Sequence, residues 1–256
     1  MSTTYVRATM KKGFRYCRVK GAMLELLSDP PWLDHVHSLG EIGAALLPVS
    51  APCEPSKVVC LGVNYADHAK EFKHEMPECP LLFMKAPSAV IGPDQDIVYP
   101  PYWTTQVDYE GELAIVIGKT AKNVPASQAL GYVFGYTCLN DVTARDLQRK
   151  DGQWTRAKSF DTFCPIGPHI VTDIDPSNLR IRTLVNGTVR QESSTANLLF
   201  KIPQIVEFVS KSMTLLPGDV IATGTPSGVG PLKPGDEVAI EIEQVGTLRN
   251  KVVPGA

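Results

Sequence analysis

The distribution of apolar and polar positions along the chain is typical of many short strands and few helices. Apolar residues run together or alternate over short segments, for example in residues 57–63, 80–92 and 131–140. Gly and Pro separate these segments, and the 256 residues include 20 Gly and 21 Pro. Since the segments do not alternate with helices of comparable length, the pattern predicts a β-rich α+β fold rather than a doubly wound parallel sheet.

Two segments carry the clearest local signals, one for a helix and one for a hairpin. Residues 202–213 predict the one long helix, because a proline suits its first turn and apolar residues follow at helical spacing. That apolar stripe consists of Ile202, Ile205, Val206, Val209 and Met213. Alternating residues flank Asn186-Gly187, a dipeptide that predicts a β-hairpin. Shorter helical segments are predicted over residues 125–130 and 144–152.

The N-terminal part of the chain differs from the rest. Residues 1–50 read as a small β-subdomain, with strands on both sides of a turn at Gly21. Residues 46–57 are rich in Pro and Ser, which is typical of a linker. We therefore predict an N-terminal subdomain of residues 1–50 and a main domain of residues 56–256.

Composition and charge exclude several classes of function. The formal net charge is −2 and the basic residues are scattered, so neither a nucleic acid nor an anionic membrane is predicted as a partner. No apolar run has the length needed to span a bilayer, and the N-terminus lacks the apolar core of a signal peptide. The six cysteines form no CxxC pair, which favours reduced packing residues over a zinc site. We expect a cytoplasmic protein.

Two glutamates stand at the start of the strongly apolar segment 113–117. Glu110 and Glu112 are two residues apart, so on a strand their side chains share a face. Either the strand end is exposed and both carboxylates are solvated, or a divalent cation lies between them. Mg²⁺ and Mn²⁺ prefer such hard oxygen ligands.

A third carboxylate would complete one face of such a metal site. Asp141 follows a predicted strand and is the natural third ligand, with Asp108 and Asp146 as its competitors. Asp141 is also suited to cap the helical segment that follows it.

Three further features carry candidate chemistry. His68 and Glu71 lie three residues apart on a predicted helical turn, either as an imidazole base supported by a carboxylate or as an exposed ion pair. Lys158 is flanked by aromatic residues, and either holds a substrate carboxylate or lies on the surface over those rings. Residues 223–230, "TGTPSGVG", can offer backbone N–H groups and the Thr225 hydroxyl to an anion.

Together, these motifs resemble the fumarylacetoacetate hydrolase family. In order they are "GVNYADHAKE", "PLLFMKAPSAVIGP", "VDYEGELAIVIGK", "NDVTARDLQ", "WTRAKSFDTFCPIGP", "VNGTVRQ" and "LLPGDVIATGTPSGVGPL", within residues 56–253. The "NYADHAKE" form is similar to the branch of acylpyruvases, oxaloacetate decarboxylases and 2-hydroxyhepta-2,4-diene-1,7-dioate isomerases. The resemblance implies a mixed β-sandwich roll and a homodimer.

The resemblance also implies roles for individual residues. It places Mg²⁺ or Mn²⁺ on Glu110, Glu112 and Asp141, and a His68–Glu71 dyad on a helix that covers the substrate. Lys158 matches an active-site lysine, and Gln148 and Thr225 match substrate-contacting positions. One departure concerns the substrate, because Val63 stands where related acylpyruvases often carry a basic residue.

The expected activity is cleavage of a C–C bond in a 2-oxo acid of the acylpyruvate or fumarylpyruvate type, through a metal-stabilised enolate. The alternative is an isomerase or decarboxylase of aromatic-compound degradation, or an oxaloacetate decarboxylase or tautomerase. A non-catalytic dicarboxylate-binding module is a third possibility, and the complete set of carboxylates, dyad and lysine argues against it.

Overall fold

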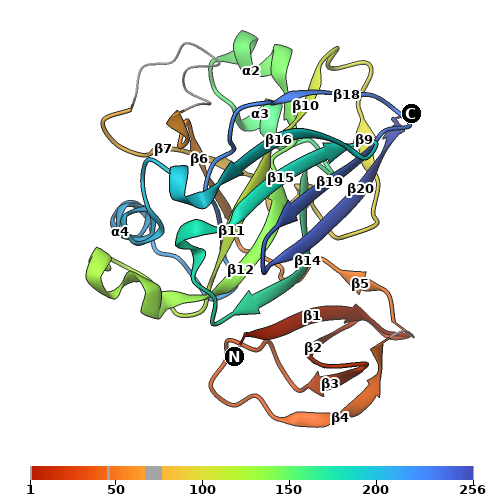
Figure 1. Ribbon diagram of the computed structural model, residues 1–256, viewed down its shortest axis with the longest axis vertical. Helices are drawn as coiled ribbons and strands as arrows, with labels where there is room; N and C mark the ends of the chain where they lie inside the picture. Colours follow the sequence, from red (N-terminus) through yellow and green to blue (C-terminus); the bar gives the residue numbers. More distant parts are fainter. Residues whose placement is uncertain (1, 45–46, 67–76, 256) are drawn as a thin grey trace.

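The computed structural model describes residues 2–44, 47–66 and 77–255, which form a β-rich molecule (Figure 1). Strands dominate and helices are few and short, so the predicted fold class is confirmed. The N-terminal strands, drawn in red and orange, lie below the main body in Figure 1.

The N-terminal strands form an antiparallel meander with a small core of its own. They are β1 (Thr3–Thr9), β2 (Phe14–Lys20), β3 (Met23–Leu27) and β4 (Ser38–Gly43), and the turn between β2 and β3 contains Gly21 as predicted. The predicted linker is a packed connection, because β5 (Val49–Ser50) pairs with β1, and Ala51 and Cys53 are buried.

The meander continues into the largest sheet, because β1 pairs with β14 in the register Thr3↔Thr172. From β1 the sheet runs through β14 (Cys164–Thr172), β12 (Val133–Asn140), β11 (Gly111–Ile117), β17 (Val220–Ala222), β6 (Val58–Gly62) and β7 (Leu81–Lys85). The short β8 (Val90–Ile91) pairs with β14. The sheet is mixed, since β17 runs parallel to β6, and β8 to β14, whereas the other pairs are antiparallel.

A second sheet packs against this one to form the sandwich. Its strands in spatial order are β16 (Thr188–Ser194), β15 (Arg180–Val185), β19 (Glu237–Ile242), β20 (Gly246–Pro254) and β9 (Ile97–Tyr99). The predicted hairpin is confirmed, with Asn186-Gly187 as the turn between β15 and β16. A small third sheet consists of β13 (Thr143–Ala144), β10 (Val107–Tyr109) and β18 (Gly230–Leu232).

Strand β11 is buried on both faces, which explains its continuous apolar sequence. Leu113, Ile115 and Ile117 belong to the main core, which also contains residues of β15 and β19. Ala114 and Val116 belong to a second cluster on the opposite face.

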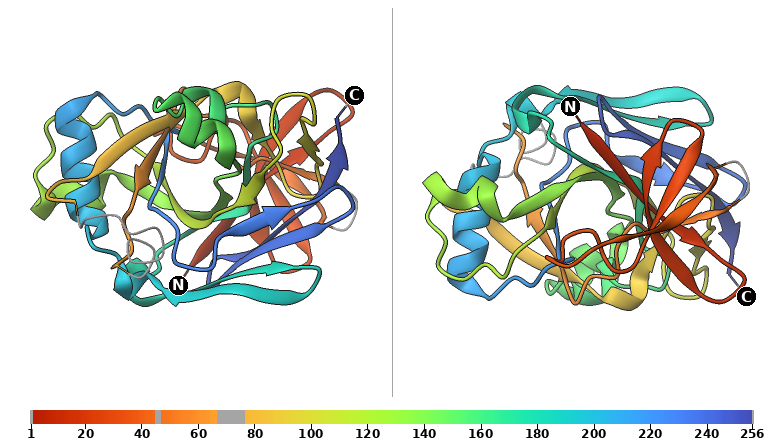
Figure 2. Two further views of the ribbon diagram at one scale, coloured as in Figure 1. Left: turned by 90° about the horizontal axis from the view of Figure 1, so that it is seen from above. Right: turned by 90° about the horizontal axis from the view of Figure 1, so that it is seen from below.

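The helices lie at the periphery of the sheets. They are α2 (Arg145–Asp151), α3 (Thr155–Lys158) and α4 (Ile202–Ser212), with 3₁₀ helices η2 (Pro87–Ala89), η3 (Ala126–Tyr132), η4 (Pro176–Asn178) and η5 (Thr195–Asn197). The helix predicted over 202–213 is confirmed, and it buries the predicted apolar stripe except the half-buried Met213. Figure 2 shows α4 at one side of the molecule, away from β19 and β20. Within the described ranges, no helix has the length and apolarity required to cross a membrane.

Candidate metal and substrate site

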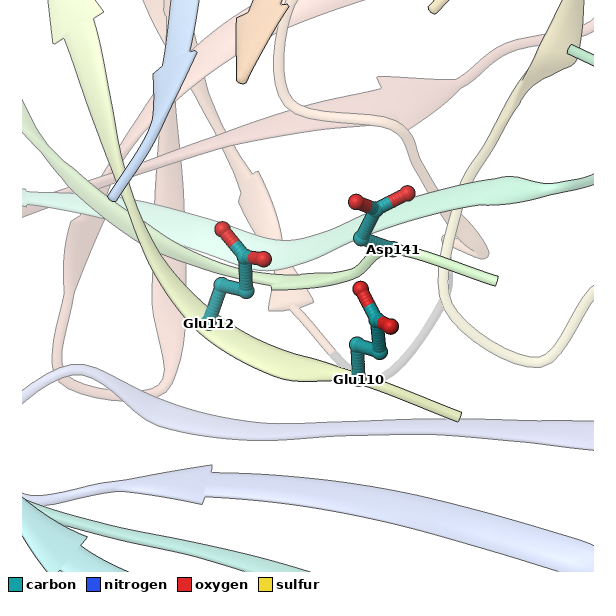
Figure 3. Close-up of side chains that lie close together, drawn as sticks. All are labelled: Glu110, Glu112 and Asp141. Carbon is teal, nitrogen blue, oxygen red and sulfur yellow. The ribbon is translucent and has the colours of Figure 1, made fainter. Parts of the chain in front are cut away.

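Three buried carboxylates meet where the small sheet adjoins the largest sheet (Figure 3). Glu110 lies between β10 and β11, Glu112 lies in β11, and Asp141 directly follows β12. One carboxylate oxygen from each residue lies within 4.8 Å of the others. The exposed-strand alternative for the two glutamates is therefore wrong, and their predicted proximity is confirmed.

The backbone holds Glu110 beside Asp141. Strands β11 and β12 pair in the register Gly111↔Asn140. The Asp141 N–H donates to the Glu110 carbonyl at 2.8 Å, and the Glu110 N–H donates to Asn140 Oδ1 at 3.0 Å. Asp141 does not cap a helix, because α2 begins at Arg145.

Two glycines are required for this arrangement. A Cβ on Gly111 would lie 2.1 Å from Thr183 Oγ1, so only glycine lets β11 approach β15 between the two glutamates. Gly224 has a φ of +98°, a conformation that side chains disfavour, and its N–H donates to Glu112 Oε2 at 2.7 Å. The segment 223–230 thus presents a backbone N–H to an anion, which is the carboxylate of Glu112.

Two buried lysines neutralise part of the cluster. Lys158 Nζ donates to Glu110 Oε2 at 2.8 Å and to Asp141 Oδ2 at 2.7 Å, and it lies 4.7 Å from the centre of the Phe83 ring. Lys85 Nζ donates to Asp141 Oδ1 and, at 3.0 Å, to the Val142 carbonyl. The surface alternative for Lys158 is therefore wrong. Burial lowers the pKa of Lys158, but Asp141 and Glu110 outweigh it and raise that pKa to about 12.

A buried arginine connects the triad to α2. The guanidinium of Arg145 donates to Asp108 Oδ2 at 2.8 Å, to Gln148 Oε1 at 2.6 Å and to Glu110 Oε1. Asp108 is thus paired with Arg145, and Asp146 accepts hydrogen bonds from Thr104 and Thr105. The two competitors of Asp141 lie outside the carboxylate triad.

Glu112 is the least compensated carboxylate of the triad. Burial, together with Asp141 and Glu110, raises its pKa well above the ordinary value, although the Gly224 N–H lowers it. Among the residues that the structure describes, no lysine or arginine donates a hydrogen bond to Glu112. A divalent cation fits this site, because it would supply the missing positive charge to a set of hard oxygen ligands.

A cavity of about 300 Å³ opens onto Glu110 and Glu112, and Gln148 and Thr225 are among its lining residues, so their predicted contact with substrate stays a prediction. The Thr225 hydroxyl donates to the Gly111 carbonyl at 2.9 Å and accepts from Gln191 at 2.8 Å. Its contacts therefore support the backbone of β11. Val63 also lines the cavity, with a φ of 56° that is rare for a β-branched residue.

Sequence reasoning missed Lys85 and Arg145. Both stand in motifs that were recognised, and a lysine that ends the apolar strand 81–85 is the signal that could have revealed Lys85. Arg145 lies three residues before Gln148, on the same helix face. His68 and Glu71 lie outside the described residues, so the predicted dyad stays a prediction.

Known proteins resemble this chain over most of its length. The family model described as fumarylacetoacetate (FAA) hydrolase C-terminal matches residues 57–253. An uncharacterized protein of Methanocaldococcus jannaschii is 59% identical over 199 residues, or 78% of this chain and 84% of that protein. The mitochondrial oxaloacetate tautomerase of Rattus norvegicus is 46% identical over 210 residues, or 78% of this chain and 67% of that protein.

A solved structure extends the similarity to nearly the whole chain. The 5-carboxymethyl-2-hydroxymuconate delta-isomerase of Mycobacterium smegmatis matches with a TM-score of 0.92 and 46% sequence identity. The match covers 98% of this chain and 100% of that one. It confirms the predicted fold, including the N-terminal strands.

Proposed function

Since this chain belongs to the fumarylacetoacetate hydrolase family, we propose that it is a divalent-metal-dependent isomerase that interconverts the keto and enol forms of a 2-oxo acid. The observation that carries the proposal is the buried triad of Glu110, Glu112 and Asp141 with the Lys158 ammonium between two of its members. The similarity to a tautomerase and to an isomerase supports this reaction over C–C bond hydrolysis.

The residues of the site suit a reaction in which negative charge develops on a ligand oxygen. Bound Mg²⁺ or Mn²⁺ would act as a Lewis acid toward the carboxylate and carbonyl oxygens of a 2-oxo acid. Lys158, with its raised pKa, keeps its proton at neutral pH and provides a fixed positive charge beside the triad. Phe83 and Trp154 line the cavity and exclude water from part of the ligand.

The two reactions place different demands on the predicted dyad. Hydrolysis requires a base that activates a water molecule, whereas isomerisation requires a group that carries one proton to or from a ligand carbon. We propose that His68, supported by Glu71, carries this proton. The C–C hydrolase activity stays a prediction.

The test follows the ultraviolet absorbance of the enol of oxaloacetate in the presence of Mn²⁺, with carbon dioxide and pyruvate measured in the same samples. We expect faster enol–keto conversion than with free Mn²⁺ and no enzyme-dependent pyruvate. Lys158→Met should lower kcat by roughly 10²- to 10³-fold, the usual effect of removing one donor that stabilises a developing oxyanion.

Two results would decide against the proposal. Release of pyruvate from acetylpyruvate, without acceleration of enol–keto conversion, would favour the hydrolase. Metal-dependent binding of oxalate with no conversion of any 2-oxo acid would favour a binding module. Lys119→Gln is the matched control for Lys158→Met, because Lys119 is exposed and does not line the cavity.

A further inference from the structure

Helix α2 lines the cavity from the carboxylate triad outwards. Arg145, Gln148 and Arg149 all line the cavity, and their spacing of i, i+3 and i+4 places them on one helix face. Arg145 is buried, Gln148 is half-buried and Arg149 is exposed. This face therefore leads from the interior of the cavity to its mouth.

The cations deep in the cavity are already paired. Lys158 donates to Glu110 and Asp141, and Arg145 donates to Asp108, Glu110 and Gln148. Neither group is free to neutralise a second charge on a ligand.

Arg149 is different. Its guanidinium makes no hydrogen bond or ion pair with any residue in the described part of the chain, and yet it lines the cavity. Beside it, Gln148 accepts from Arg145 through Oε1, which leaves the two Nε2–H donors of the Gln148 amide without a described partner. A guanidinium next to an amide donor is a good match for a carboxylate.

The other lining residues near the triad offer no alternative for a second carboxylate. Leu61, Val63 and Phe83 are apolar, and Trp154 carries no charge and offers a single indole N–H. The ring of Phe83 packs edge-on against that of Trp154 with centroids 5.1 Å apart. They suit the carbon chain of a ligand. Arg149 is the one cation lining the cavity that is unpaired within the described ranges.

The charges around the cavity also favour a doubly charged ligand. The buried carboxylates are Asp108, Glu110, Glu112 and Asp141, and the cations near them are Lys85, Arg145, Arg149 and Lys158. Counted as ionised, these described groups balance, so a bound divalent metal would leave two positive charges. A 2-oxo dicarboxylate neutralises both charges, whereas a monocarboxylate neutralises one.

We propose that Arg149, assisted by the Gln148 amide, binds the distal carboxylate of a 2-oxo dicarboxylic acid and thereby selects dicarboxylates over monocarboxylates. This inference rests on the proposed function for the other end of the ligand, where the triad and the metal bind the 2-oxo acid group. Val63 stands where related acylpyruvases often carry a basic residue. In this chain Arg149 would supply a basic group at the cavity mouth.

The test compares two ligands that differ only at the far end of the chain. Binding of 2-oxopentanedioate and of 2-oxopentanoate to the Mg²⁺-loaded protein is measured by calorimetry, so turnover is not needed. Wild type should bind the dicarboxylate roughly 10- to 100-fold more tightly, the range expected for a charge-assisted hydrogen-bonded pair.

The variants distinguish a direct contact between Arg149 and the distal carboxylate from a general effect of positive charge on α2. Arg149→Gln should remove most of the preference and leave 2-oxopentanoate binding unchanged, and Arg149→Lys should retain part of it. Lys150→Gln removes an equal charge from the next, exposed position of α2, which does not line the cavity, and should keep the wild-type preference.

Several outcomes would overturn the inference. They are equal binding of the two ligands by wild type, a preference that survives in Arg149→Gln, an equal loss in Lys150→Gln, or no binding of either ligand. If the preference behaves as expected but no enol–keto conversion occurs, the distal subsite is supported and the proposed function alone fails.

Discussion

Replacing Glu112 by glutamine should have opposite effects on stability and on metal binding. The glutamine can still accept from the Gly224 N–H through its carbonyl oxygen, and its amide can donate toward Asp141 and Glu110. The change therefore removes one negative charge and keeps the shape of the site.

The size of the effect follows from the geometry of the triad. Two carboxylate oxygens no more than 4.8 Å apart repel by at least about 3.5 kcal/mol at an effective dielectric constant of about 20. The buried lysines and Arg145 offset much of this repulsion. We therefore expect the free energy of unfolding of metal-free Glu112→Gln to exceed that of the metal-free wild type by about 1–3 kcal/mol at pH 8. For a chain of this length, each 1 kcal/mol raises Tm by roughly 2–4 °C.

Bound metal should reverse the order of stability of the wild type and Glu112→Gln. At a concentration 100-fold above its Kd, a metal ion stabilises the wild type by about 2.7 kcal/mol, which is a rise in Tm of roughly 5–10 °C. Glu112→Gln should lose most of this rise, because one of three charged ligands is gone. Thermal unfolding in EDTA and in MnCl₂ measures both effects on the same samples.

The pH dependence in EDTA gives an independent check. The pKa of Glu112 is raised above its ordinary value of 4.5 by burial and by Asp141 and Glu110. Such a group contributes stability below pH 4.5 that is lost as the pH rises through the raised pKa. The advantage of Glu112→Gln should therefore grow with pH from about 4.5 upwards. A metal-free variant less stable than wild type at pH 8, with unchanged Mn²⁺ stabilisation, would refute the reasoning.

Three further predictions concern the support of the site and the assembly. Lys85→Met should destabilise the metal-free protein by about 3–5 kcal/mol in urea unfolding, because Asp141 loses one of two buried lysine partners; a loss below about 1 kcal/mol would contradict this. Gly111→Ala should lower the free energy of unfolding by about 1–3 kcal/mol or more, because the new Cβ would lie 2.1 Å from Thr183 Oγ1. Gly131→Ala, with nothing within 4 Å, is its control, and equal effects would disprove the steric argument. The predicted homodimer should show twice the chain mass of 27.9 kDa in light scattering, and a monomer at micromolar concentration would exclude it.

The elements that could be predicted from the sequence are those specified by local patterns. The stripe of α4 and the Asn186-Gly187 turn depend on neighbouring residues alone, and both were predicted correctly. The apolar run of β11 was recognisable because the strand is buried on both faces. Residues 125–130 were predicted as a short helix, and the structure forms the 3₁₀ helix η3 there.

The site was predictable only in part, because local sequence patterns reveal some of its residues and not others. Glu110 and Glu112 were recognised because they are close in sequence, and Asp141 because it ends a strand. Lys85 and Arg145 were missed because their partners are set by the tertiary fold. At Glu110 the chain leaves the small sheet, which contains β10, and enters the largest sheet, which contains β11. This step also depends on distant residues, because β10 pairs with β18 from residues 230–232.

The hydrogen bond from the Gly224 N–H to Glu112 has a consequence for the order of events during synthesis. A ribosome that has just added Asp141, the residue after β12, has made all three carboxylates, but the loop that orients Glu112 is still more than eighty residues away. β17, which precedes this loop, pairs with β6 and β11 and must also be complete. The nascent chain thus carries the ligands long before it can present them together, so the ion should be acquired only after nearly the whole polypeptide has left the ribosome.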